Sequence, residues 1–255
     1  MVWRKSGPPV SSRDAFVRSN RGGIPCLNEA EAIGSLLDSI RRIVPAVIVV
    51  DDGSVDETGG VAARVGAAVI RHPESRGKGR ALETGINWAR EQGFQWVLTM
   101  DGDGQHSPED MEKFLRVAPQ VGLVVGNRMG EASRMPFVRR QVNRWMSREI
   151  SRLAGRELPD TQCGFRRIRL EAWLGAKFGP EAAHFEIESE MILGFVAAGE
   201  AVEFVPIEVV YKDERSKIHP VRDTIRWFRW RREASRRYRG SIGTGAAKPI
   251  CEVAG

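Results

Sequence analysis

Cysteine is scarce in this sequence, and long apolar runs are missing. Only three of the 255 residues are cysteines. Cys26, Cys163 and Cys251 are far apart, odd in number and without the spacing of metal ligands, which favours reduced thiols in a cytosolic-type compartment. No apolar run approaches the roughly 18 residues of a membrane-spanning helix, and the first residues do not resemble a signal peptide. We therefore expect a cytoplasmic globular protein.

Two common nucleotide-binding motifs are also missing. The pattern G-x-x-x-x-G-K-[ST] does not occur, and no G-x-G-x-x-G follows the first expected strand, which disfavours a dinucleotide enzyme. The segment Arg76-Gly77-Lys78-Gly79 instead precedes an expected helix. Backbone N–H groups, the helix dipole and one ammonium group suit such a segment to binding an anion. Lys78 is therefore a candidate phosphate-binding residue.

Short apolar runs alternate with helical patterns, which indicates an α/β fold. Hydrophobic residues make up 42% of the chain and charged residues 28%, and the length suffices for one α/β domain. The alternation predicts a parallel sheet with right-handed crossovers. Beyond residue 128 we expect a basic helix at about 137–154, a helix at about 187–196 and a strand at 201–205. The earlier apolar runs lie at 46–50, 67–70, 96–100 and 123–125.

An acidic loop follows the apolar run at 96–100. Its sequence is Asp101-Gly102-Asp103-Gly104-Gln105-His106. Two carboxylates one residue apart at the end of a buried strand suit a Mg²⁺-like cation that carries a diphosphate, because such ions take oxygen ligands from carboxylates and substrate phosphates. Gln105 can add an amide oxygen, whereas His106 is expected to be structural, since hard cations prefer oxygen. An isolated Asp-x-Asp also arises by chance in surface loops.

Other acidic residues each allow two interpretations. Asp51 and Asp52 end an apolar run and either form a turn or accept hydrogen bonds from a nucleobase or ribose. Asp160 is either a general base for an alcohol acceptor or an ion-pair partner of nearby arginines. Three further acids near an expected helix start are either acceptor-site groups or, as we favour, solvated. They are Glu186, Glu188 and Glu190.

Positive charge is concentrated in one late segment of a chain whose net charge is +6. Residues 226–239 contain seven arginines, one acid and four aromatic residues. A solvated basic helix and a nucleic-acid-binding patch are two interpretations. A third is an interfacial helix, with arginines toward anionic headgroups and Trp227, Phe228 and Trp230 at the acyl boundary.

Taken together, five segments resemble the motifs of family 2 glycosyltransferases, which have the GT-A fold. The segments are IPCLNE at 24–29, VVDDGS at 49–54, RGKG at 76–79, DGDGQH at 101–106 and GNR at 126–128. Two more segments narrow the resemblance to the polyprenyl- or dolichyl-phosphate mannosyl- and glucosyltransferases. They are DTQCGFR at 160–166 and Tyr211 followed by SKI at 216–218. The resemblance covers roughly residues 24–225, and the joint pattern is specific.

The resemblance implies an α/β fold of the GT-A, Rossmann-like type, in which helices flank a mostly parallel sheet. One glycosyltransferase domain at 24–225 would contain a nucleotide-sugar half at 24–128 and an acceptor half at 129–225. The family's first strand falls on a polar stretch here, so residues 1–23 are expected to form an atypical segment with a partial strand. Residues 226–255 would form a basic aromatic helix and a flexible tail.

The resemblance also implies roles for individual residues. Asp101, Asp103 and Gln105 would hold Mg²⁺ or Mn²⁺ against the donor diphosphate. The nucleotide-sugar would contact Pro25, Leu27, Asn28, Glu29, Asp51, Asp52, Lys78, Asp101, Gly102 and Asp103. The acceptor phosphate would contact Arg128, Arg139 and Lys217. The candidate catalytic residues are Asp103, Asp160 and Arg166, the last by stiffening or completing the pocket.

The implied reaction transfers mannose or glucose, with inversion, from GDP-mannose or UDP-glucose to a polyprenyl phosphate. The enzyme would attach peripherally to the cytoplasmic face of the membrane. A lipid monophosphate is already anionic near neutral pH, because its second pKa is about 6, and needs no strong base. The alternatives are a family 2 transferase acting on a sugar or alcohol, and a non-catalytic nucleotide- or nucleic-acid-binding protein. The complete Asp-x-Asp-x-Gln motif disfavours the non-catalytic alternative.

Overall fold

The structure, a computed structural model, describes residues 20–26, 29–44, 46–130, 135–179, 186–209, 220–239 and 242. Its described strands form one seven-stranded sheet in the order β3-β2-β1-β4-β6-β5-β7. They are β1 (Asn20–Cys26), β2 (Val47–Asp51), β3 (Ala68–Arg71), β4 (Trp96–Thr99), β5 (Leu123–Asn127), β6 (Arg166–Arg169) and β7 (Val202–Pro206). Strand β6 runs antiparallel to β4 and β5, and the other neighbours pair in parallel. The expected mostly parallel α/β sheet is confirmed.

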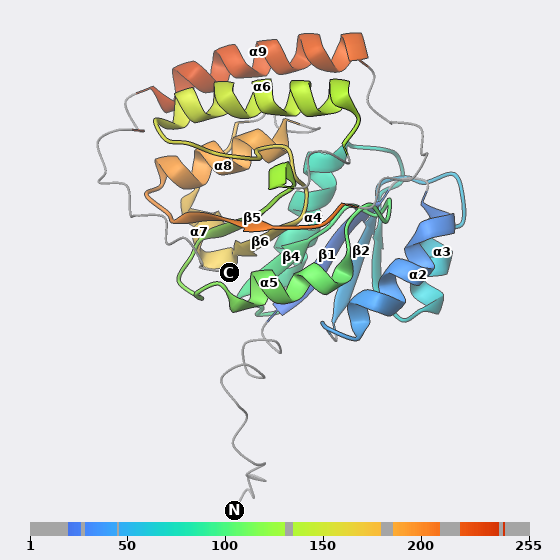
Figure 1. Cartoon of the computed structure of the whole chain (residues 1–255). Coiled ribbons are helices and arrows are strands. Elements are labelled where there is room, and N and C mark those ends of the chain that lie inside the picture. The colour runs from blue at the N-terminus through green and yellow to red at the C-terminus, as the bar shows by residue number, and fades with distance from the viewer. Residues whose placement is uncertain are drawn as a thin grey trace, which may run out of the picture.

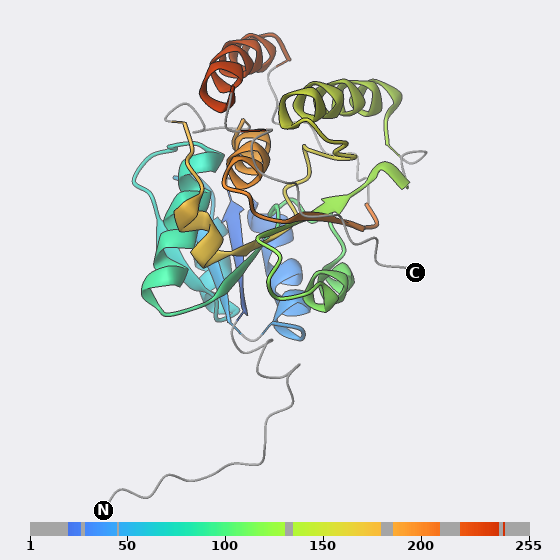
Figure 2. The same ribbon diagram turned by 90° about the vertical axis from the view of Figure 1, so that its left-hand side faces the viewer.

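Helices cover both faces of this sheet (Figures 1 and 2). They are α2 (Ala30–Arg41), α3 (Thr58–Arg64), α4 (Lys78–Glu91), η1 (Pro108–Asp110), α5 (Met111–Arg116), α6 (Phe137–Ala154), α7 (Leu170–Gly175), α8 (Ile187–Ala197) and α9 (Pro220–Tyr238). Figure 2 shows α4 on one face and α2 with α5 on the other. Helices α6 and α9 form an outer layer beyond α8 (Figure 1). Among the described helices, none combines the length and apolar character required to cross a membrane.

Strand β1 lies where the sequence predicts a partial first strand. It lies in the middle of the sheet and pairs with β2 on one side and β4 on the other. Backbone hydrogen bonds to both neighbours hold this segment in place, although its sequence, NRGGIPC, lacks the apolar pattern of a buried strand. The expected domain boundary between residues 23 and 24 therefore falls inside β1, and that between 225 and 226 falls inside α9.

Strand β6 and the following α7 were not expected from the sequence. The strand sequence is Arg-Arg-Ile-Arg, which contains three cations in four residues. Arg167 is nevertheless buried, because its guanidinium donates hydrogen bonds to the backbone carbonyl oxygens of Phe114, Val117 and Ala118 at 2.7–2.8 Å. These acceptors lie about fifty positions earlier in the chain. A local apolar pattern cannot reveal a strand whose burial depends on such distant partners.

Candidate active site

The carboxyl ends of β2, β4 and β5 meet at one edge of the sheet, where open α/β folds place their ligands. Asp51 ends β2, Asp101 comes two residues after β4, and Arg128 directly follows β5. Three motifs that are separated in the sequence are thereby brought to one edge. This edge is the candidate active site.

Asp101 is held by a lysine at the start of a neighbouring helix. The Lys78 ammonium lies 2.6 Å from Asp101 Oδ1 and 2.5 Å from Glu188 Oε1. Burial alone would lower the pKa of Lys78, but the two carboxylates raise it above its usual range. Burial alone would raise the pKa of Asp101, but Lys78 and then His106, whose Nε2 lies 3.8 Å from Oδ2, lower it. Asp101 is therefore ionised at neutral pH.

Gly164 makes room for Asp101. A Cβ atom at this position would lie 2.6 Å from Asp101 Oδ1 and 2.7 Å from Oδ2, which is far below van der Waals distance. The Thr99 hydroxyl donates a 2.9 Å hydrogen bond to the Gly164 carbonyl oxygen and ties this segment to β4. Sequence reasoning gave Gly164 no role, although a glycine inside the 160–166 motif was a signal of such close approach.

The other two expected metal ligands lie on the same loop as Asp101. The Gln105 backbone N–H donates to Asp103 Oδ1 at 3.0 Å, and the Arg139 Nη1 lies 3.4 Å from the Gln105 amide oxygen. Within the described residues, no group of three or more His, Cys, Asp or Glu side chains is arranged to hold a metal ion. Two carboxylates and an amide oxygen nevertheless fit a hard cation whose remaining ligands are phosphate oxygens and water. Arg139 joins the loop from α6.

The two carboxylates at the end of β2 accept hydrogen bonds from backbone N–H groups of nearby turns. Asp52 is buried, and its oxygens accept hydrogen bonds from the Ser75 hydroxyl and the Arg76 and Gly77 backbone N–H groups at 2.8–2.9 Å, with His72 Nδ1 at 2.6 Å. Burial alone would raise the pKa of Asp52, but these contacts lower it. The Asp52 oxygens thus have partners within the protein, and the base- or ribose-binding role expected of Asp52 stays a prediction.

Asp51 is likewise fully buried. Its Oδ1 accepts a 2.9 Å hydrogen bond from the Ser54 backbone N–H, and its Oδ2 lies 3.6 Å from Arg71 Nε. A Cβ on Gly59 would lie 2.8 Å from Oδ2, so the start of α3 closes over the carboxylate. The turn-forming interpretation of Asp51 and Asp52 is the one that the structure supports.

The remaining donor-binding candidates are described only in part. Leu27 and Asn28 lie outside the described residues, as does Lys217, the third residue predicted to contact the acceptor phosphate. Pro25 lies in β1, where it is paired with Val50 of β2. Glu29 precedes α2, and its backbone N–H donates to the Thr58 hydroxyl at 2.8 Å. Gly102 is buried in the turn after β4. Their contacts to a nucleotide-sugar stay predictions.

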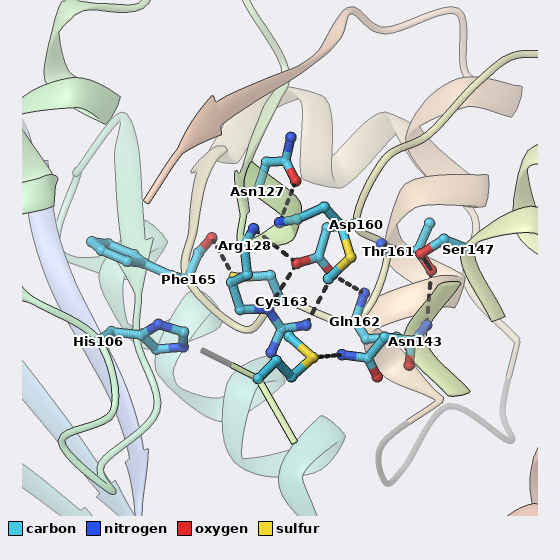
Figure 3. A network of polar contacts seen from close by, with 12 residues as sticks. His106, Asn127, Arg128, Asn143, Ser147, Asp160, Thr161, Gln162, Cys163 and Phe165 are labelled. Atoms are coloured by element: carbon cyan, nitrogen blue, oxygen red, sulfur yellow. Dashed lines mark hydrogen bonds and ion pairs between the residues drawn. The ribbon is translucent and has the colours of Figure 1, made fainter. Parts of the chain in front are cut away.

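Asp160 forms an ion pair with Arg128 (Figure 3). The Arg128 Nε and Nη2 donate to the two Asp160 oxygens at 2.7 and 2.9 Å, and the Arg128 backbone N–H donates to Oδ2 at 3.1 Å. Burial alone would raise the pKa of Asp160, but Arg128 lowers it. A carboxylate with a lowered pKa and a bidentate guanidinium partner is a weak base. The ion-pair interpretation therefore fits the structure better than the general-base role.

Arg166 is fully buried against the first turn of α8. Its Nε donates to the Cys163 carbonyl oxygen at 2.8 Å, its Nη1 to that of Glu188 at 2.7 Å, and its Nη2 to that of Thr161 at 3.1 Å. A guanidinium group enclosed in this way stiffens the segment 160–166. These contacts fit the stiffening role that the resemblance allowed for Arg166, and its catalytic role stays a prediction.

The three acids near the start of α8 are buried, so the expectation of a solvated helix start was wrong. Glu190 accepts hydrogen bonds from four donors: the Gly179 backbone N–H, Trp230 Nε1, Arg237 Nη1 and the Tyr238 hydroxyl, all at 2.6–2.8 Å. Three of these donors belong to α9, so Glu190 anchors that helix onto α8. Glu186 and Glu188 are also buried.

Helix α9 exposes only one of the three aromatic residues that the sequence suggested for a membrane surface. Trp227 and Trp230 are buried, Trp230 to 1% exposure, and both belong to the hydrophobic core. Only Phe228 of the three aromatic residues at 227–230 is exposed. The interfacial roles expected of Trp227 and Trp230 are therefore wrong, because these side chains face inward.

Comparison with known proteins gives a consistent family signal. The family described as Glycosyl transferase family 2 matches residues 23–173. The undecaprenyl-phosphate mannosyltransferase of Micrococcus luteus is 29% identical over 202 residues, which cover 74% of this chain and 83% of that protein. The dolichyl-phosphate hexose transferase of Haloferax volcanii is 31% identical over 197 residues, covering 76% and 83%.

A solved structure shares the fold. The glucosyl-3-phosphoglycerate synthase of Mycobacterium tuberculosis in complex with UDP superposes with a TM-score of 0.65 at 20% identity, over 98% of this chain and 95% of that one. The same synthase has been crystallised with Mn²⁺, UDP and phosphoglyceric acid, and that structure superposes with a TM-score of 0.62 at 19% identity, over 94% and 85%.

Proposed function

Because this chain belongs to glycosyl transferase family 2 and is a glycosyltransferase of the GT-A fold, we propose that it transfers a hexose from a nucleotide-sugar to a polyprenyl phosphate. The observation that carries the proposal is the contact between Arg139 and Gln105. The Arg139 guanidinium is suited to binding an acceptor phosphate. Gln105 belongs to the loop that is suited to a metal-bound diphosphate, so the contact joins the two sites. The named activities of the relatives from Micrococcus luteus and Haloferax volcanii, both transfer to a lipid phosphate, support the same acceptor class.

The proposed chemistry relies on charge placement and needs no strong base. The acceptor monophosphate supplies an anionic oxygen as the nucleophile, since its second pKa is about 6. Arg128, oriented by Asp160, and Arg139 would hold that phosphate in line with the anomeric carbon. When bound at Asp101, Asp103 and Gln105, Mg²⁺ or Mn²⁺ would offset the charge that develops on the leaving nucleoside diphosphate.

Two donors, GDP-mannose and UDP-glucose, are the proposed substrates to compare first. We expect purified protein to form labelled lipid from one labelled donor, a polyprenyl phosphate and Mg²⁺ or Mn²⁺, and to stop when EDTA removes the metal. Extraction of the product into organic solvent followed by scintillation counting measures it. Parallel reactions with simple sugars or alcohols serve as acceptor controls. Label in those acceptors but not in lipid, or no lipid product with any nucleotide-sugar, would contradict the proposal.

We propose that α6 and α9 form the membrane-facing surface for this acceptor. Phe137 and Val138 are 65% and 73% exposed and directly precede Arg139, which contacts Gln105 of the proposed metal-binding loop. Phe228 of α9 is 50% exposed and packs against Trp145 of α6, with ring centroids 5.5 Å apart. We call the exposed apolar residues of the two helices the α6–α9 patch. Its members are Phe137, Val138, Val142, Trp145, Ile225 and Phe228.

Charge on the same helices supports an anionic lipid surface as the partner of the α6–α9 patch. Exposed arginines accompany the apolar residues on both helices. Apolar groups entering the acyl boundary beside arginines at the headgroups are typical of peripheral membrane helices. The proposal is therefore peripheral attachment to a membrane, with the patch next to the acceptor site. The arginines are Arg144 and Arg148 on α6 and Arg229 and Arg232 on α9.

The triple variant Phe137→Ser, Val138→Ser, Phe228→Ser should lose membrane attachment. We expect its partition onto phosphatidylglycerol vesicles to fall by about tenfold or more, because three exposed apolar side chains no longer enter the bilayer. Co-sedimentation measures the bound fraction. The matched control is Leu174→Ser, which removes an apolar side chain of α7 that is 60% exposed and outside the patch. Equal losses in the two variants, or no loss in the triple variant, would show that the patch is not the attachment surface.

A further inference from the structure

Lys78 stands between two carboxylates that come from different parts of the fold. Asp101 follows β4, and Glu188 lies in the first turn of α8. The ammonium nitrogen is 2.6 Å from Asp101 Oδ1 and 2.5 Å from Glu188 Oε1. Glu188 Oε2 is buried and has no hydrogen-bond partner among the described residues. Glu188 therefore has an acceptor in reserve that Lys78 does not use in this structure.

This arrangement creates a conflict once Asp101 serves as a metal ligand. A divalent cation and an ammonium group on one carboxylate repel each other, and the repulsion is strong where water is scarce. Lys78 cannot simply move into solvent at little cost, because its ammonium would leave Glu188 buried and without its countercharge. Glu188 is a second carboxylate that the ammonium can bind without contacting the metal ligand Asp101.

We propose that Glu188 is a positioning residue that takes over the Lys78 ammonium when a metal ion binds at Asp101, and so frees Asp101 as a ligand. The inference rests on the proposed function, which places a metal at Asp101. When the metal enters, the Lys78 ammonium moves its hydrogen bonds from Asp101 to the second oxygen of Glu188. No covalent bond changes and no proton is transferred in this exchange.

The position of Glu188 is fixed by the surrounding structure. Its backbone carbonyl oxygen accepts a 2.7 Å hydrogen bond from Arg166 Nη1, and Arg166 is tied in turn to the carbonyl oxygens of Thr161 and Cys163. The same segment contains Gly164, whose missing side chain leaves space for Asp101. Arg166 and Gly164 thus set the two carboxylates on either side of Lys78, which gives the 160–166 motif a role in metal binding without a ligand of its own.

A double-mutant cycle on Mn²⁺ binding tests the inference without depending on glycosyl transfer. Free Mn²⁺ is counted by electron paramagnetic resonance during titration of the full-length protein. We expect Glu188→Gln to raise the Kd for Mn²⁺ about tenfold, because Lys78 then remains on Asp101. In a Lys78→Met background the same Glu188→Gln change should leave the Kd unaltered, since the competing ammonium is gone. Glu200→Gln, which loses an ion pair with Arg169 away from the site, should bind Mn²⁺ as the wild type does.

The cycle separates positioning from plain electrostatics. If Glu188 attracts the metal directly through its charge, Glu188→Gln weakens Mn²⁺ binding equally in both backgrounds, and the inference is overturned. An unchanged Kd in Glu188→Gln overturns it as well. Should a single variant fail to fold, the double variant Lys78→Met, Glu188→Gln removes both charges together and must bind Mn²⁺ at least as tightly as the wild type. A failure of the lipid-transfer assay with an intact Mn²⁺ cycle would reject the acceptor assignment and leave this inference standing.

Discussion

Replacing Asp103 by alanine is expected to lower glycosyl transfer by roughly a thousandfold or more. The carboxylate is partly exposed in the loop after β4, and it accepts a hydrogen bond from the Gln105 backbone N–H. Without it the metal keeps only Asp101 and Gln105 from the protein, and the charge on the leaving diphosphate is poorly offset. Initial rates at saturating metal and donor, measured as labelled lipid, give the size of the effect.

A matched variant separates metal binding from loop structure. Asp103→Asn keeps an oxygen that can accept the Gln105 N–H, but it loses the negative charge that attracts a cation. We expect Asp103→Asn to lose nearly as much activity as Asp103→Ala, while both variants unfold at the wild-type temperature. Full activity in Asp103→Ala would remove the metal role from this residue. If Asp103→Asn is active and Asp103→Ala is not, Asp103 shapes the loop and does not bind the metal through its charge.

Replacing Glu190 by alanine is expected to destabilise the fold by about 3–5 kcal/mol, the cost typical of removing one partner of a buried ion pair. Four donors would lose this carboxylate, and three of them, Trp230, Arg237 and Tyr238, belong to α9. The Tyr238 hydroxyl would keep the Lys177 carbonyl oxygen as an acceptor. Burial raises the pKa of the Tyr238 hydroxyl, and the neighbouring Glu190 carboxylate raises it further, so this hydroxyl stays protonated as a donor. Urea unfolding followed by circular dichroism measures the loss.

The control for Glu190 is an ion pair at the surface. Glu171→Ala removes a carboxylate whose side chain is almost fully exposed and which pairs with Arg169 at 2.8 Å. Exposed pairs contribute about 0–1 kcal/mol, so the midpoint of unfolding should hardly move. If the urea concentration at the unfolding midpoint is no lower for Glu190→Ala than for Glu171→Ala, the anchoring of α9 does not depend on the Glu190 carboxylate.

Much of the sheet could be predicted from local pattern. The apolar runs at 46–50, 67–70, 96–100 and 123–125 correspond to β2, β3, β4 and β5, and α6 begins and ends at the expected residues 137 and 154. These elements carry their own signal, since buried parallel strands are continuously apolar. Strands β1 and β6 lack that signal. Their place depends on backbone pairing with both neighbours and, for Arg167, on carbonyl groups about fifty residues away.

The sequence by itself determined the family and the order of its motifs, and it placed an acidic loop directly after a strand. It could do so because residue type, spacing and strand ends are local properties. Only the tertiary structure decided how each charge is used. Asp52 accepts hydrogen bonds from a turn, Asp160 orients Arg128, and Glu188 forms an ion pair with Lys78. It also turned Trp230 inward and left Phe137 exposed. Each of these outcomes depends on which distant segment packs against the residue, and burial then makes an ionic or polar partner obligatory.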